Sequence, residues 1–123
     1  MTTAGVRFAQ CLAAKDEPSL RAVLAPDVDF RALTPRRPWE AVDVDGVLEA
    51  VFGSWFTPSD EILTALDVRD GADVADTHAV AYRLRVQNST GTYLVEQQAY
   101  YRCDAEDRID YLRLLCSGYR PVT

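Results

Sequence analysis

The spacing of apolar residues changes once along the chain, near Glu61, and this change limits the possible folds more than any other feature. Before it, apolar residues recur every three or four positions, the period of a helix with one buried face. After it they alternate, which is the period of a strand. Short turns rich in Gly, Asn and Asp join the alternating segments, so consecutive strands must be antiparallel. Helices ahead of an antiparallel sheet predict an α+β fold.

The helical half predicts three helices. The first lies within residues 3–15, where Phe8 and Leu12 are four positions apart. The second begins at Asp16-Glu17-Pro18, an acidic cap followed by a proline suited to a first turn, and ends by Pro26. The third begins after an aspartate cap at position 43 or 45. It places Leu48, Val51, Phe52 and Trp55 on one face, and Pro58 closes it.

The remaining segments predict strands and one long loop. Residues 28–32 alternate like a short strand, whereas residues 34–42 contain Pro35 and Pro38 and are expected to form a loop. Four further strands are expected at roughly 61–69, 76–87, 92–103 and 108–117.

Alternation assigns the strand residues to two faces. The face expected to cover the helices is mostly apolar and holds Val80, Tyr82, Leu84, Val86, Gln97, Ala99, Tyr101, Cys103, Leu112, Leu114 and Cys116. The opposite, outer face holds Arg83, Arg85, Glu96, Gln98, Tyr100, Arg102, Tyr111 and Arg113. Such a half-apolar outer face suits pairing between two copies of the sheet, and a solvated face is the alternative.

Length and charge exclude several classes of protein. The 123 residues fit a single domain, 1–123, and the 13 Lys+Arg against 19 Asp+Glu argue against a nucleic-acid partner. No apolar run is long enough to span a membrane, and the first residues lack the order of a signal peptide, so a cytoplasmic protein is expected. Three cysteines far apart and one histidine predict no metal site.

Four segments carry a resemblance to a known family: Asp16-Glu17-Pro18-Ser19-Leu20, Asp27-Val28-Asp29-Phe30, the stretch from Tyr93 to Arg102, and Arg108-Ile109-Asp110-Tyr111-Leu112-Arg113. Together with the order of elements, they resemble the nuclear transport factor 2-like superfamily, which includes the SnoaL-like polyketide cyclases and the ketosteroid isomerases. The resemblance covers nearly the whole chain. It implies a conical, cystatin-like barrel with three N-terminal helices packed on a curved, mostly antiparallel sheet. It also implies a deep apolar pocket and often a homodimer.

The catalytic groups of the ketosteroid isomerases are not matched. Those enzymes use an Asp base on the first strand, with a Tyr and a protonated Asp as donors where enolate charge develops. By element and offset, Phe8 takes the tyrosine position, Ala32 that of the base and Ala99 that of the second acid. The resemblance therefore does not carry isomerase activity to this chain.

Other chemistries of the superfamily have few matching residues. The cyclases use an inward Asp, often with His. His78 and Asp76 share the inward parity, so they form either an acid–base pair or a solvent-facing pair beside a turn. The epoxide hydrolases use an Asp-Arg-Asp set, but Arg83 and Arg85 are expected to face outward, and Arg85 stands where that set needs an acid.

The expected pocket lining is aromatic with few polar groups. Its candidate ligand-binding residues are Phe8, Phe30, Trp39, Phe52, Trp55, Tyr82, Gln97, Tyr101, Leu114 and Cys116. Trp39 is interpreted either as a pocket lid or as a surface anchor, and no catalytic residue is assigned. The chain has no glycine-rich phosphate loop and no nucleophile elbow, so no cofactor is expected.

Two functions remain open. The first is a SnoaL-like protein that binds an apolar polyketide-, terpenoid- or steroid-like molecule, as an isomerase, cyclase or dehydratase acting by proton transfer. The second is a non-catalytic binding or assembly module that uses the outer sheet face for dimerisation. An open pocket would favour the first function, and an interior filled by its own side chains would favour the second.

Overall fold

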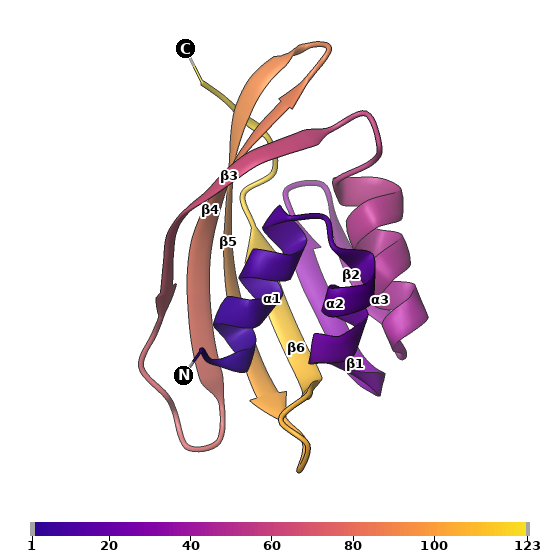
Figure 1. Ribbon diagram of the computed structural model, residues 1–123, viewed down its shortest axis with the longest axis vertical. Coiled ribbons are helices and arrows are strands. Elements are labelled where there is room, and N and C mark those ends of the chain that lie inside the picture. Colours follow the sequence, from indigo (N-terminus) through magenta and orange to yellow (C-terminus); the bar gives the residue numbers. More distant parts are fainter. Residues whose placement is uncertain (1, 123) are drawn as a thin grey trace.

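A computed structural model describes residues 2–122 as helices packed on one curved sheet (Figure 1). In chain order the elements are α1 (Ala4–Ala13), α2 (Glu17–Val23), β1 (Leu24–Thr34), β2 (Arg37–Ala41), α3 (Val44–Ala50), the π-helical turn η1 (Val51–Trp55), β3 (Glu61–Asp70), β4 (His78–Asn88), β5 (Gly91–Cys103), β6 (Ile109–Cys116) and β7 (Arg120–Pro121). The predicted α+β class is confirmed.

The sheet has the strand order β2-β1-β6-β5-β4-β3, and β7 pairs with β5. All pairs are antiparallel except β1 with β6, which run parallel. Among the described residues β2 and β3 have no further neighbour, so the sheet curves without closing. In Figure 1, β6 lies between β1 and β5 and joins the first strands of the chain to the later ones.

The helices cover the inner face of the sheet (Figure 1). Helix α1 packs over β3 and β4, and α3 packs over β1 and β2. Phe8 and Leu12 of α1 are fully buried, as their spacing predicts. Asp16 caps α2 by accepting from the Ser19 backbone N–H, and Asp43 caps α3 by accepting from Gly46. The expected helix starts are thus confirmed.

The predicted faces of the sheet are confirmed. Val80, Tyr82, Leu84 and Val86 of β4 are buried, whereas Arg83 and Arg85 between them are exposed. The same alternation continues on β5, where Gln97, Ala99 and Tyr101 are buried while Gln98, Tyr100 and Arg102 are exposed. The inner face thus forms the core together with the helices, and the outer face meets solvent in this single chain.

Two expectations about the segment between the second and third helices are wrong. Residues 34–42 contain the strand β2 rather than only a loop, because β2 is an edge strand, where the missing N–H of Pro38 costs little. Strand β1 starts at Leu24, earlier than expected, and includes Pro26. That proline falls where the β1–β6 register is interrupted, between Leu24 and Asp29, so it displaces no ladder hydrogen bond.

Candidate functional site

A line of polar side chains crosses the inner face of β4, β5 and β6. The register pairs Tyr82 with Gln97 and Gln97 with Cys116. The Tyr82 hydroxyl donates to Gln97 Oε1 at 2.6 Å, and Gln97 Nε2 donates to Cys116 Sγ at 3.4 Å. Burial raises the pKa of Tyr82 well above its ordinary value, so this hydroxyl stays protonated and acts as a donor.

Besides the aromatic side chains that carry a hydroxyl or an N–H, Gln97 is the one buried polar or charged side chain of residues 2–122. Its Nε2 faces only a thiol sulfur, which is a weak acceptor. A buried amide that lacks a strong acceptor keeps part of its desolvation cost. The interior therefore offers an N–H to any oxygen that reaches it.

Three aromatic rings lie together where β1, β2 and η1 meet. The Trp55 ring lies 6.0 Å from the Phe30 ring and 5.8 Å from the Trp39 ring, which meets it edge to face. Trp39 is half-buried, donates through Nε1 to Thr34 Oγ1 at 3.0 Å and is covered outside by the Arg37 guanidinium, 3.8 Å from its centroid. Trp39 therefore lies at the surface beside Trp55, and its roles as a pocket lid or a surface anchor both stay predictions.

The Trp55 indole ring is held in place, but its N–H group has no hydrogen-bond partner among the described residues. Its side chain is 9% exposed, and its Nε1 is buried without any hydrogen-bond partner among the described residues. The π-helical turn η1 delivers this ring, and Tyr119 fixes the turn by donating from its hydroxyl to the Trp55 carbonyl at 2.8 Å. Buried indole N–H groups normally find a partner, so this free donor marks a place suited to a ligand acceptor.

The interior is packed by its own side chains. Of the predicted lining residues, Phe8, Phe30, Trp55, Tyr82, Gln97, Tyr101 and Leu114 are buried, and Trp39, Phe52 and Cys116 are half-buried. Three of them, Tyr82, Gln97 and Cys116, line a hollow of about 470 Å³ together with outer-face residues such as Arg83 and Gln98. Tyr101 lines hollows around the amino end of α1, and Leu114 lines one of about 290 Å³ beside Leu33 and Leu115. A ligand that lay between the buried rings of Phe8, Phe30 and Trp55 would have to displace side chains, whereas Tyr82, Gln97 and Cys116 already border a hollow.

The positions matched to the isomerase acids hold small or apolar side chains. Phe8, Ala32 and Ala99 are all buried. Ala32 and Ala99 both pair with Leu114, from the strands on either side of it. The inner face therefore has two small side chains in one row across β1, β6 and β5, next to the row of Gln97. The described interior thus has hydrogen-bond donors and no carboxylate.

His78 pairs with a different aspartate from the one that strand parity suggests. Its Nδ1 lies 2.9 Å from Asp73 Oδ1, while Asp76 lies 3.7 Å from Arg102 Nε. The His78 ring packs against Tyr101 but is over a third exposed at the end of β4. The pair lies at the rim of the sheet, outside the polar line of Tyr82 and Gln97.

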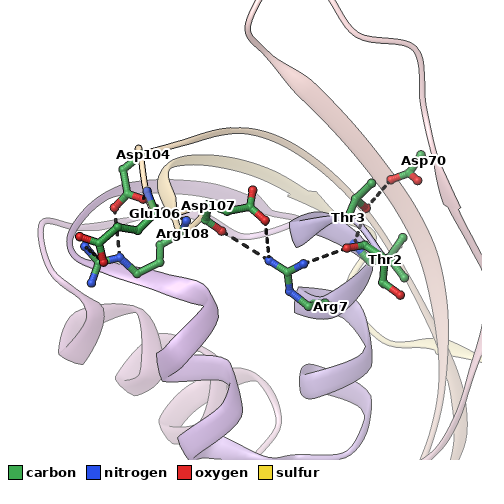
Figure 2. Close-up of polar contacts among 9 residues, drawn as sticks. Thr2, Thr3, Arg7, Asp70, Asp104, Glu106, Asp107 and Arg108 are labelled. Atoms are coloured by element: carbon green, nitrogen blue, oxygen red, sulfur yellow. Dashed lines mark hydrogen bonds and ion pairs between the residues drawn. The ribbon is translucent and has the colours of Figure 1, made fainter.

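The amino end of α1 is closed by polar contacts (Figure 2). Thr3 donates to Asp70 Oδ1 at 2.7 Å and caps the helix by accepting from the Val6 backbone N–H at 3.2 Å. Arg7 bridges the Thr2 carbonyl at 2.8 Å and the Asp107 carboxylate at 3.1 Å. These contacts tie α1 to the end of β3 and to the β5–β6 turn.

Among residues 2–122, no three His, Cys, Asp or Glu side chains gather as a metal site would require. No helix in that range is long and apolar enough to cross a membrane.

The comparisons with known proteins are structural. No protein-family model matches the chain, and no curated protein matches its sequence. The fold matches an LEH-like epoxide hydrolase from M. tuberculosis with a TM-score of 0.68 and 13% identity, over 93% of this chain and 80% of that one. It matches a ketosteroid isomerase-like protein from Erwinia carotovora atroseptica with a TM-score of 0.66 and 17% identity, over 96% and 92%.

A designed protein has the same architecture. A computationally designed 17-OHP binder matches with a TM-score of 0.64 and 17% identity, over 93% of this chain and 95% of that one. The chain shares the α+β fold of these solved structures, as the order of its elements predicted. At these identities the likeness establishes the fold, and the site must be argued from this chain's own residues.

Proposed function

We propose that this protein binds a mainly apolar small molecule, of polyketide-, terpenoid- or steroid-like size, between its helices and the inner face of its sheet. The observation that carries the proposal is the buried Trp55 Nε1 with no hydrogen-bond partner in residues 2–122. Proteins keep such donors rarely, because an unsatisfied buried N–H is costly. An oxygen acceptor on a bound molecule would remove that cost.

The polar groups of the interior indicate what kind of oxygen atom a ligand would carry. Trp55 and Gln97 both offer N–H groups, and the described interior holds no charged side chain to balance an ion. A neutral carbonyl on an apolar body satisfies a donor without bringing a charge into a low-dielectric interior. We therefore propose a ketone or a related carbonyl compound as the ligand class.

The proposed chemistry follows from the same donors. Donors fixed around a carbonyl oxygen stabilise the negative charge that develops there when a proton passes from the neighbouring carbon to a water molecule, since the described interior holds no carboxylate to accept it. Isomerisation, cyclisation and dehydration of carbonyl compounds all pass through such a charge. If the protein turns its ligand over, we propose a reaction of this class, with the Tyr82 hydroxyl holding Gln97 in the orientation that presents its N–H.

Binding of 2-decalone, compared with its hydrocarbon counterpart decalin, tests this proposal. The ketone is expected to quench the fluorescence of Trp55 with a saturable curve, and Trp55→Phe or Gln97→Leu should weaken its binding about three- to tenfold, the value of one hydrogen bond. Binding in Trp55→Phe is followed by thermal shift. Arg85→Gln, an exposed change on the outer face, is the matched control. Equal affinity for ketone and hydrocarbon, or unchanged affinity in both interior variants, would contradict the proposal.

The packed interior supports a second candidate, a non-catalytic module that assembles through the outer face. Leu33, Tyr100 and Leu115 on that face are 53%, 44% and 55% exposed. Exposed large apolar side chains that lie together suit a contact between two sheets. Sedimentation over a range of concentrations tests it: a homodimer that Leu115→Glu dissociates supports this candidate, and a monomer at every concentration rejects it.

A further inference from the structure

Cys116 is the third member of the polar line across β4, β5 and β6, after Tyr82 and Gln97. It is half-buried, and all three residues line the hollow of about 470 Å³. A hollow of this size accommodates a small molecule. A thiol, an amide and a phenol therefore border one space that a ligand can occupy.

The turn after Cys116 aims a backbone N–H at the sulfur. The Gly118 N–H donates to Cys116 Sγ at 3.4 Å. Gly118 has a φ of 72°, which favours glycine, and a Cβ there would lie 2.8 Å from Pro35. Ser117 holds the same turn, because its Oγ donates to the Gly118 carbonyl at 2.8 Å and its N–H donates to the Glu96 carbonyl at 2.9 Å. The backbone thus fixes the position of this donor.

Gln97 supplies the other donor to the sulfur, since its Nε2 donates to Cys116 Sγ at 3.4 Å. The thiolate is the nucleophilic form of cysteine, and N–H groups stabilise a negative charge on their acceptor. The N–H groups of Gln97 and Gly118 are therefore placed to stabilise the charge that the Cys116 sulfur carries when it attacks an electrophile.

The two other cysteines lie in surroundings that disfavour such an attack. Burial, followed by the Asp107 carboxylate, raises the pKa of the Cys103 thiol to about 11. Burial, followed by the Asp16 carboxylate, raises the pKa of the Cys11 thiol. The hydrogen bonds that sulfur accepts within residues 2–122 are the two at Cys116. Cys116 is thus the thiol best placed to react.

The Gln97 amide adds a second observation, which points to a ligand. Its side chain is 3% exposed, and its Nε2 carries two hydrogens, of which Cys116 Sγ accepts one. Nε2 has no other acceptor among residues 2–122, so its second N–H is free. A buried N–H without an acceptor costs free energy, and a ligand oxygen beside Cys116 would remove that cost.

The free N–H and the sulfur match the two reactive ends of an α,β-unsaturated ketone. Its carbonyl oxygen accepts a hydrogen bond, and its β-carbon, three bonds away, is the atom that a thiolate attacks. That span is comparable to the 3.4 Å between Gln97 Nε2 and Cys116 Sγ. A saturated ketone would use the N–H alone and would leave the sulfur without a partner.

We propose that Cys116 adds to the β-carbon of an α,β-unsaturated ketone whose oxygen accepts the free N–H of Gln97. This inference rests on the proposed function, because it requires a carbonyl ligand beside Gln97. The thiol gives its proton to water, the sulfur forms a carbon–sulfur bond, and the carbon–carbon π bond breaks. The π electrons pass to the carbonyl oxygen, where the N–H stabilises the enolate charge. Water then returns a proton to the α-carbon, and the product is a thioether with no leaving group.

Mass spectrometry of the full chain with 2-cyclohexen-1-one tests the proposal, with cyclohexanone as the saturated control. The enone should add once, with a gain equal to its own mass, and peptide mapping should place it on Cys116. At pH 8 the rate at Cys116 should exceed the rate at Cys103 about tenfold or more. Cyclohexanone should leave the mass unchanged. Cys116→Ser should abolish the adduct, and Cys103→Ser, the matched control, should keep it.

Methyl methanethiosulfonate modifies thiols without a carbonyl contact, so it separates the role of Gln97 from access to the sulfur. Gln97→Leu should slow the enone about three- to tenfold more than it slows this reagent, the value of one hydrogen bond. Equal slowing of both reactions would overturn the proposal, because the N–H would then not act on the carbonyl. Faster addition at Cys11 or Cys103 than at Cys116 would overturn it as well.

Binding of 2-decalone distinguishes failure of this inference from failure of the proposed function. If 2-decalone binds and the enone forms no adduct at Cys116, the inference is wrong while the proposed function stands. If 2-decalone does not bind and the enone reacts equally fast with wild type and Gln97→Leu, both are wrong, because the sulfur then reacts without a carbonyl site.

Discussion

The hydrogen bond from Tyr82 to Gln97 is the polar contact at the centre of the interior, and at 2.6 Å it is short and fully buried. Tyr82→Phe leaves the Gln97 carbonyl without its donor and should lower the free energy of unfolding by about 1–3 kcal/mol. Gln97→Leu leaves the Tyr82 hydroxyl without its acceptor and should cost a similar amount. Urea unfolding of both single variants and of the double variant measures the coupling. The double variant should lose less than the sum of the two, and strictly additive losses would show that the contact contributes nothing.

Cys103 gives the protein a defined sensitivity to alkaline pH. Burial, followed by the nearby Asp107 carboxylate, raises the pKa of its thiol to about 11, above the 9.0 of an ordinary cysteine. Between these values the unfolded chain has lost a proton that the folded chain keeps, so the free energy of unfolding should fall as the pH rises. Urea midpoints at pH 8 and pH 10 should differ more in the wild type than in Cys103→Ala. Cys11, whose pKa burial also raises, serves as a comparison in Cys11→Ala. Equal pH dependence in the wild type and Cys103→Ala would refute the assignment.

At the scale of elements, the amino end of α1 carries both a helix cap and a surface ion pair, so their contributions to stability can be compared (Figure 2). Thr3 caps the helix and also bonds Asp70, whereas the Arg7–Asp107 pair is largely exposed. Thr3→Ala should therefore lower the free energy of unfolding by about 1 kcal/mol, and Thr3→Ser should restore most of it. Asp107→Asn should change it by less than about 1 kcal/mol. Thermal unfolding of the three variants measures these losses of stability. A larger loss in Asp107→Asn than in Thr3→Ala would contradict the prediction.

The elements also show what local sequence patterns can predict. Helix starts, strand faces and the buried Gln97 follow from spacing and capping residues within a few positions of each other. Strand β2 cannot be predicted from such local patterns. A proline is tolerated only on an edge strand, and whether a strand lies at the edge depends on the whole sheet. For the same reason the pairing of Leu33 with both Pro38 and Leu115 could not be predicted, because it depends on two strand registers that bring distant segments together.

The candidate site, too, could be predicted only in part from local sequence patterns. Its aromatic and polar residues could be named from strand parity and helix spacing. The missing partner of Trp55 Nε1 could not, because it depends on how η1 turns the ring toward Phe30 and Trp39. The pairing of His78 with Asp73 was missed because Asp73 lies in the turn before β4, where strand parity does not apply.

For the whole molecule, the parallel pairing of β1 with β6 makes folding depend on the end of the described chain. Strand β6 buries Ile109, Leu112 and Leu114 and is the neighbour of both β1 and β5. A chain that stops at Asp104 should therefore lack cooperative thermal unfolding and near-ultraviolet circular dichroism. A chain that stops at Gly118 keeps β6 and should retain both. A cooperative transition in the shorter chain would mean that the remaining strands form a stable sheet without β6.

The same pairing has a consequence for synthesis on the ribosome. The chain emerges amino end first, so β1 leaves the ribosome roughly 75 residues before β6 and waits several seconds for it at ordinary rates of elongation. During that time the side of β1 that β6 will cover is an open strand edge, next to a hydrophobic segment that includes Val28 and Phe30. Open edges of this kind bind other strands, including those of nascent chains nearby. A chaperone that shields residues 24–34 until synthesis is complete would therefore raise the yield of this protein more than its stability.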